Sequence, residues 1–250
     1  MRFGRVMRGT RAVFVRLEGD TLRLLTRAPW AGGVALDEVW SMSDNRLLAP
    51  CVPGKIVCVG LNYADHIAEM GEAQPADPVL FLKPPSSVIG PGDTIRWPAM
   101  AGQVDYEGEL GIVIGKTAKN IEKQDAERYI FGYTCVNDVT ARDLQARDGQ
   151  WTRAKGFDTF CPLGPWVETE LYTGDCLVQT SLNGEIVQRS STAHMIHGIA
   201  ALVSFVSRVM TLQPGDVIAT GTPSGIGPMQ AGDTVQITVG DIGPLTNIIG

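Results

Sequence analysis

The sequence predicts a mostly β chain with many turns, short strands and modest helix content. Glycine (29) and proline (15) together make up 44 of the 250 residues, about 18%, against about 12% in an average protein. Apolar residues account for 44% and charged residues for 19%, which excludes intrinsic disorder for most of the chain. A chain of this length buries roughly 70–75% of its unfolded surface, so its core needs no disulfides.

Charge and cysteine usage exclude several classes of function. The net charge of −6 is acidic and unclustered, which argues against nucleic acid or a membrane surface as the main partner. The longest stretch without acidic or basic residues, 190–207, holds two histidines and five hydroxyl residues, so it is too polar to span a bilayer. Five cysteines without a CxxC motif, and an N-terminus without an apolar signal segment, predict a reduced cytoplasmic protein.

The first fifty residues are predicted to form a small β-rich module. Two alternating runs, 12–17 and 21–25, are separated by an acidic glycine turn typical of a hairpin. Residues 28–50 show no regular pattern. Two prolines and a glycine at 50–54 then indicate a boundary, so we expect an N-terminal module at 1–50 and a catalytic domain at 51–250.

The second part of the chain is predicted to alternate strands with a few helices. Apolar runs predict strands at 55–60, 79–82, 110–114, 177–182, 217–220 and 235–239. Helices are predicted at 64–70, ending at Gly71, and at 124–129 and 140–147. Apolar residues at helical spacing predict a core-facing helix within 190–207, and residues 72–78 are expected to form a mobile loop.

Two acidic residues, Glu107 and Glu109, carry the first chemical signal. Side chains on a strand alternate between its faces, so these two carboxylates share one face while Leu110 and Ile112 point the other way. Two such carboxylates repel each other, and a divalent cation with oxygen ligands would relieve the repulsion. Two glutamates on a solvated strand face are an equally good interpretation of the spacing alone.

Other candidates have simpler interpretations when taken one at a time. Asp138 lies where an apolar strand meets a polar helix, a place for a ligand and also for an ordinary helix cap. Lys155 precedes a glycine among aromatic residues but could be a surface lysine. His194 and His197 could ligate a metal, but no acidic third ligand lies near them in the sequence.

Taken together, these segments resemble the fumarylacetoacetate hydrolase superfamily over about residues 51–250. The resemblance rests on five segments in the family's order: 59–70, 81–84, 107–110, 137–143 and 220–223. The first fifty residues are similar to a small module of many bacterial members. The chain looks most like single-chain bacterial acylpyruvate hydrolases, oxaloacetate decarboxylases and 2-hydroxyhepta-2,4-diene-1,7-dioate isomerases.

The resemblance implies a fold and a set of roles. The fold is an α+β, mostly β structure: a mixed β-sandwich roll with peripheral helices, usually homodimeric. The implied roles are, by residue, metal ligands Glu107, Glu109 and Asp138; catalytic His66, Glu69 and Lys155; and substrate-binding Arg142, Gln145, Thr222 and Lys83. The implied cofactor is Mg²⁺, with Mn²⁺ as an alternative.

The implied reaction is cleavage of the carbon–carbon bond β to the carbonyl of a 2-oxo acid through a metal-stabilised enolate. In acylpyruvate hydrolysis, His66 oriented by Glu69 would take a proton from the attacking water. Oxaloacetate decarboxylation needs no such water. An isomerase would reprotonate the same enolate elsewhere, and a non-catalytic metal-binding or ligand-sensing protein is the alternative from another class. The sequence leaves the substrate open.

Overall fold

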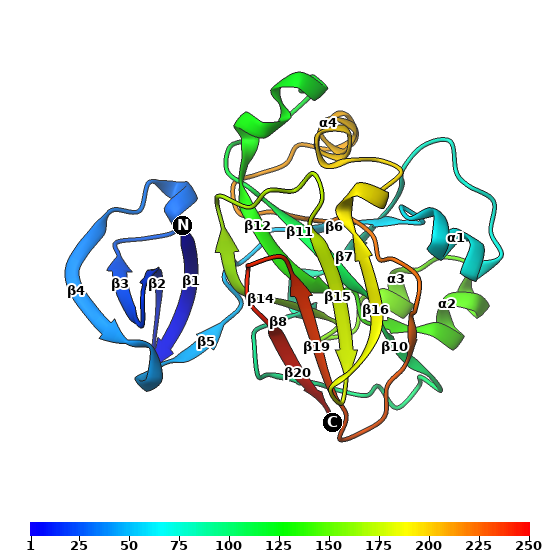
Figure 1. Cartoon of the computed structure of the whole chain (residues 1–250), viewed down its shortest axis with the longest axis horizontal. Coiled ribbons are helices and arrows are strands. Elements are labelled where there is room, and N and C mark those ends of the chain that lie inside the picture. Colours follow the sequence, from blue (N-terminus) through cyan, green and yellow to red (C-terminus); the bar gives the residue numbers. More distant parts are fainter.

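The computed structural model describes all 250 residues and is mostly β-structure, as the sequence predicts. One large mixed sheet of twelve strands runs through the molecule, a five-stranded sheet packs against part of it, and a small three-stranded sheet lies near the candidate site. Helices lie at the periphery (Figure 1). No helix is long and apolar enough to cross a membrane.

The large sheet has ten strands in its main path. In spatial order these are β4 (Ala35–Ser41), β3 (Thr21–Leu25), β2 (Arg11–Glu18), β1 (Arg2–Arg8), β14 (Cys161–Glu168), β12 (Ile130–Asn137), β11 (Gly108–Ile114), β17 (Val217–Ala219), β6 (Ile56–Gly60) and β7 (Val79–Lys83). Two short strands pair outside this path, β5 (Arg46–Leu48) with β1 and β8 (Val88–Ile89) with β14.

The remaining strands form the two smaller sheets. The five-stranded sheet runs β16 (Glu185–Ser191), β15 (Leu177–Leu182), β19 (Thr234–Val239), β20 (Leu245–Ile249) and β9 (Thr94–Ile95). The small sheet is β13 (Thr140–Ala141), β10 (Val104–Tyr106) and β18 (Gly227–Pro228). The α-helices are α1 (Ala64–Met70), α2 (Arg142–Asp148), α3 (Thr152–Lys155) and α4 (Ile199–Val209).

The N-terminal strands form a meander that continues the large sheet. The predicted hairpin is confirmed, because β2 and β3 pair antiparallel across the acidic turn. β1 then pairs with β14, with Arg2 opposite Glu168. The meander has its own apolar cluster, and Trp166 of β14 belongs to it. The expectation of irregular structure over 28–50 was wrong, because β4 and β5 lie there. β4 has a single buried residue, Trp40, so its sequence carries no strand alternation.

The central strands β11 and β12 are buried on both faces. On one face Leu110 and Cys135 pack with residues of the five-stranded sheet. Further along this face Ile112 packs with Leu202 and Val203 of α4. On the other face Val113 and Val136 pack with Leu163. Burial on two faces explains why these strands read as continuous apolar runs. The predicted core-facing helix within 190–207 is therefore confirmed, although it begins at Ile199.

Two helices differ from the prediction, one in its type and one in the residue at which it begins. Residues 123–129 form a 3-10 helix. Helices of this type are short, and the spacing of apolar residues in so short a segment does not distinguish them from an α-helix. The helix expected at 140–147 starts only at Arg142, because residues 140 and 141 pair as β13 with β10. The helix ending at Gly71 is confirmed, and Gly71 adopts the left-handed conformation (φ 68°) that closes it.

The pairing of β11 with β12 brings the acidic segments together. The strands are antiparallel, with Gly108 opposite Asn137. Glu107 and Asp138 are each one residue beyond this pair, and the Asp138 N–H donates to the Glu107 carbonyl (2.9 Å). The beginning of one strand and the end of the other therefore meet at one corner of the sheet.

Candidate active site

Three buried carboxylates meet at this corner. Glu107 links β10 to β11, Glu109 lies on β11 and Asp138 follows β12; each is at most 4% exposed. One oxygen from each can be chosen so that the three lie within 4.8 Å of one another. The structure thus brings together the three predicted metal ligands, and the solvated strand face is excluded because both glutamates are buried.

Backbone and side-chain donors hold these carboxylates in place. The Asn137 amide oxygen accepts a hydrogen bond from the Glu107 N–H (3.0 Å). The Gly221 N–H donates to Glu109 Oε2 (2.8 Å), and the Thr140 hydroxyl donates to Glu107 Oε1 (3.2 Å). These contacts hold Glu107 and Glu109 beside Asp138, with an oxygen of each carboxylate within 4.8 Å of the others.

Two cations are paired directly with the carboxylates in the cavity. The Lys155 ammonium lies between two of them, 2.8 Å from Glu107 Oε2 and 2.7 Å from Asp138 Oδ2. The Arg142 guanidinium binds Glu107 Oε1 through Nη2 (2.5 Å), Asp105 Oδ2 through Nε (2.8 Å) and Gln145 Oε1 through Nη1 (2.5 Å). Arg142 and Gln145 therefore form one unit at the start of α2.

Lys83 lies behind Asp138, outside the cavity lining. Its ammonium donates to the carbonyls of Val139, Lys155 and Phe160 at 2.7–2.9 Å and lies 2.7 Å from Asp138 Oδ1. The resemblance assigns Lys83 to substrate binding. Its contacts in the structure are with Asp138 and the backbone around it, and Lys83 itself does not line the cavity.

The charges of this cluster do not balance. Four carboxylates (Asp105, Glu107, Glu109, Asp138) face three cations (Lys83, Arg142, Lys155), and no cation lies within ion-pair distance of Glu109. Burial, with the Asp138 and Glu107 charges, raises the pKa of Glu109 well above its ordinary value. Burial also disfavours the ionised form of Glu107. The positive charges of Lys155 and Arg142 outweigh the effect of burial and lower the pKa of Glu107.

The residues present fit a divalent cation. An ammonium has three protons, and those of Lys83 are used by three carbonyls, which leaves the buried Asp138 Oδ1 without a hydrogen bond. The donors are all carboxylate oxygens, the ligand type that Mg²⁺ and Mn²⁺ prefer. A bound cation would also compensate the excess negative charge on Glu109.

A histidine of helix α1 faces the carboxylates. His66 Nδ1 lies 3.1 Å from Glu69 Oε2, and Glu69 Oε1 accepts the Gly225 N–H (2.9 Å). The Ser224 hydroxyl also donates to Asp65 Oδ2 (2.9 Å). These contacts fix α1 against the loop at 222–226, and they leave His66 Nε2 for the cavity.

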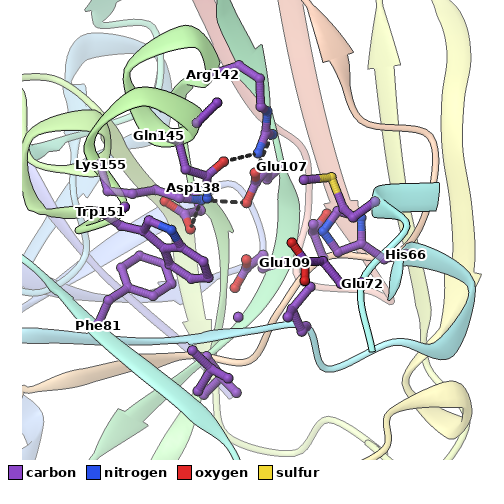
Figure 2. A pocket seen from close by; sticks show the side chains of 18 residues that line it. His66, Glu72, Phe81, Glu107, Glu109, Asp138, Arg142, Gln145, Trp151 and Lys155 are labelled. Atoms are coloured by element: carbon purple, nitrogen blue, oxygen red, sulfur yellow. Dashed lines mark hydrogen bonds and ion pairs between the residues drawn. The ribbon is translucent and has the colours of Figure 1, made fainter. Parts of the chain in front are cut away.

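A cavity of about 440 Å³ joins these groups (Figure 2). Its polar lining includes His66, the three carboxylates, Arg142, Gln145, Lys155 and Thr222. Its apolar wall is formed by Val59, Leu61, Met70, Val79, Phe81 and Trp151. Glu69 acts on His66 from outside this lining. His194 and His197 do not line the cavity.

Sequence reasoning missed several residues of this site. Trp151 packs edge-on against Phe81 (ring centroids 5.3 Å apart), and a Cβ at Gly60 would lie 2.7 Å from the Trp151 ring. The glycine in the 59–70 segment is the signal for this packing. Glu72 also lines the cavity from the α1 side (Figure 2). Its N–H is held by the Ile67 carbonyl (3.2 Å) at the end of α1.

The sequence and the fold match known proteins over the whole chain. Residues 55–249 match the family described as fumarylacetoacetate (FAA) hydrolase C-terminal, and residues 1–50 match Rv2993c-like, N-terminal. Protein Rv2993c of Mycobacterium tuberculosis is 49% identical over 99% of this chain and 97% of its own.

Two relatives have names that describe a reaction. A structure from Mycobacterium marinum, named 2-hydroxyhepta-2,4-diene-1,7-dioate isomerase, has a TM-score of 0.93 at 46% identity and covers 100% of this chain and 98% of its own. Oxaloacetate tautomerase YisK of Bacillus subtilis is 45% identical over 85% of this chain and 75% of its own length.

Neutralising Glu107 and neutralising Glu109, each in a separate variant, should change the free energy of unfolding in opposite directions. Both Glu107→Gln and Glu109→Gln remove a ligand, so we expect calorimetry to show loss of Mg²⁺ binding in each. Without metal, Glu107→Gln should lower the free energy of unfolding by about 1–3 kcal/mol, because Lys155 and Arg142 lose a partner. Glu109→Gln should raise it, because the unpaired buried charge disappears.

Asp138→Ala should also lose Mg²⁺, and Glu122→Ala, a change of an exposed carboxylate, serves as the control. Unchanged Mg²⁺ affinity in all three ligand variants would show that the carboxylates do not form the metal site.

Mg²⁺ affinity should rise with pH. Ligands must be deprotonated to bind a metal, and the pKa of Glu109 is raised. Below that raised pKa, Mg²⁺ must displace the Glu109 proton, so its affinity falls as the pH falls. Calorimetry in buffers of different ionisation enthalpy should show release of up to about one proton per ion bound. A constant affinity from pH 5 to pH 8 without proton release would contradict the assignment.

Proposed function

Because this chain belongs to the fumarylacetoacetate hydrolase family, we propose that it is a divalent-metal-dependent enzyme that forms the enolate of a short 2-oxo acid and moves a proton at the adjacent carbon. One observation carries the proposal: His66 and the three carboxylates line the same cavity. A base thus faces the place where the carbonyl of a metal-bound 2-oxo acid would lie.

The proposed division of labour follows from the distances. Glu107, Glu109 and Asp138 would hold the cation, which would polarise the 2-oxo group as a Lewis acid. Lys155 is fixed by two carboxylates and would place its positive charge beside the developing oxyanion. Gln145 accepts from Arg142 through its oxygen, which leaves its amide N–H groups for the substrate.

His66 would hold and return the proton. Glu69 contacts Nδ1 and is itself held by Gly225, so the ring is oriented and Nε2 is the nitrogen for proton transfer. Removing a proton from one carbon and returning it elsewhere needs a single base and no attacking water. The names of the B. subtilis and M. marinum relatives describe reactions of this kind, tautomerisation and isomerisation.

Cleavage of the carbon–carbon bond, as in acylpyruvate hydrolysis or oxaloacetate decarboxylation, is the second candidate. The apolar wall of the cavity favours it, because Leu61, Phe81 and Trp151 offer a surface for an acyl arm beyond the 2-oxo acid. Both candidates share the enolate, and they differ in whether a proton or a carbon substituent leaves. Product analysis by NMR with oxaloacetate and acetylpyruvate, with and without EDTA, separates the two.

The His66→Ala variant tests the proposed base. Oxaloacetate tautomerisation and acetylpyruvate hydrolysis both need a positioned base, so we expect kcat to fall by about 10²–10⁴-fold. Mg²⁺ affinity should not change, because His66 is not a ligand. Oxaloacetate decarboxylation should fall less, because it needs no proton removal from water or carbon.

The control is His194→Ala, which changes a histidine outside the cavity. If kcat for tautomerisation and hydrolysis stays at the wild-type level in His66→Ala, His66 has no catalytic role. If decarboxylation falls by the same factor as the other reactions, His66 acts by holding helix α1 over the cavity and not as the base.

Glu72 should reduce activity on diacids. The two cations that line the cavity are already paired with carboxylates, and Glu72 adds a negative charge at its mouth. Glu72→Gln should therefore raise kcat/KM for oxaloacetate relative to acetylpyruvate about two- to fivefold, as expected for an exposed charge pair. Asp77→Asn, on the same loop but outside the lining, is the control. An equal change on both substrates would contradict this role.

A further inference from the structure

A buried glutamine, Gln188 of β16, lies behind the candidate site and is not used by the chemistry above. It is 1% exposed and belongs to the five-stranded sheet, whereas Glu109 belongs to the large one. We propose that Gln188 is a positioning residue: it holds the backbone between Glu107 and Glu109 and orients the Thr222 hydroxyl. This inference rests on the metal site of the proposed function.

Every hydrogen-bonding position of this amide is occupied. Gln188 Oε1 accepts from the Gly108 N–H (3.0 Å) and from the Thr180 hydroxyl (2.6 Å). Nε2 donates to Thr222 Oγ1 (2.8 Å) and to the Pro223 carbonyl (2.9 Å). A side-chain amide offers two donors and two acceptor lone pairs, so this set determines which end of the amide is oxygen.

The contact with Gly108 acts on the metal ligands. Gly108 is the single residue between Glu107 and Glu109. Its N–H is held by Gln188, and its carbonyl accepts from the Thr222 hydroxyl (3.0 Å). A Cβ at this position would lie 2.2 Å from Thr180 Oγ1, so the strand approaches the glutamine network too closely for any side chain. The backbone that spaces the two glutamates is therefore fixed from behind by one amide.

The contact with Thr222 acts on the cavity. The Thr222 hydroxyl accepts from Gln188 and donates to Gly108, so its proton points away from the cavity and only one lone pair remains. Groups behind metal ligands commonly control affinity, and their loss typically costs 10–100-fold. Gln188 contacts both the backbone between the two ligands and the cavity residue Thr222, contacts that a glutamine filling the core would not need.

Three variants separate positioning from simple packing. Gln188→Leu removes all four hydrogen bonds. Gln188→Glu keeps both acceptor contacts, including the one to Gly108, but loses both donor contacts, including the one to Thr222. Thr180→Val, the matched control, removes only the contact between Thr180 and Gln188 and leaves the contacts of Gln188 with Gly108, Thr222 and Pro223. Calorimetry measures two affinities for each: Mg²⁺ alone, and oxalate, an enolate mimic, in the presence of Mg²⁺.

We expect Gln188→Leu to bind Mg²⁺ 10–100-fold more weakly than wild type, and Thr180→Val to stay within about threefold. Gln188→Glu should keep wild-type or tighter Mg²⁺ affinity, because its carboxylate still accepts from Gly108 and adds negative charge. The same variant should bind oxalate at least tenfold more weakly, because the charge of the new carboxylate repels the anion.

Equal losses of Mg²⁺ affinity in Gln188→Leu and Thr180→Val would overturn the positioning role, as would parallel losses of Mg²⁺ and oxalate in Gln188→Glu. If Gln188→Leu does not fold, the split between Mg²⁺ and oxalate in Gln188→Glu decides alone. The wild type is measured first: if it binds neither probe, the proposed function fails and this inference with it. If it binds both and the variants match it, only the role of Gln188 fails.

Discussion

The structure depends on a buried excess of negative charge at one corner of the large sheet. Four carboxylates meet three cations, and Glu109 is the one without an ionic partner. An uncompensated buried charge is costly, and a protein relieves it by protonation or by binding a cation. The raised pKa of Glu109 is the first response, and the oxygen-only set of donors makes the second available. The antiparallel register of β11 and β12 creates this situation, because it ends both strands at the same place.

The groups around this corner divide into those that hold the charge and those that use it. Lys83 contacts Asp138 and the backbone around it, and Gln188 contacts the backbone between Glu107 and Glu109, so both maintain the geometry without lining the cavity. His66 and Lys155 face the cavity, where one can carry a proton and the other can stabilise an oxyanion. Glu69 and Asp65 hold α1 against the 222–226 loop, and in this position α1 presents His66 to the cavity.

Local patterns predicted those parts of the site that local geometry determines. Glu107 and Glu109 could be linked from strand alternation, whereas Asp138, His66 and Glu69 joined them through the family resemblance. Gln188 and Lys83 could not be understood in this way, since their contacts arise from pairing between distant segments. β4 was missed because an exposed edge strand carries no apolar alternation, and the helix at 123–129 was predicted with the wrong hydrogen-bonding pattern because it is short.

We propose that Glu107, Glu109 and Asp138 hold one divalent cation to which the 2-oxo acid binds. The decisive experiment is a crystal structure with Mn²⁺ and oxalate, with data collected at the manganese absorption edge. We expect one anomalous peak in direct contact with an oxygen of each carboxylate, with oxalate bound to the same ion through two oxygens and within reach of Lys155. Manganese bound elsewhere, or oxalate held by Arg142 and Lys155 without an ion at the carboxylates, would contradict it.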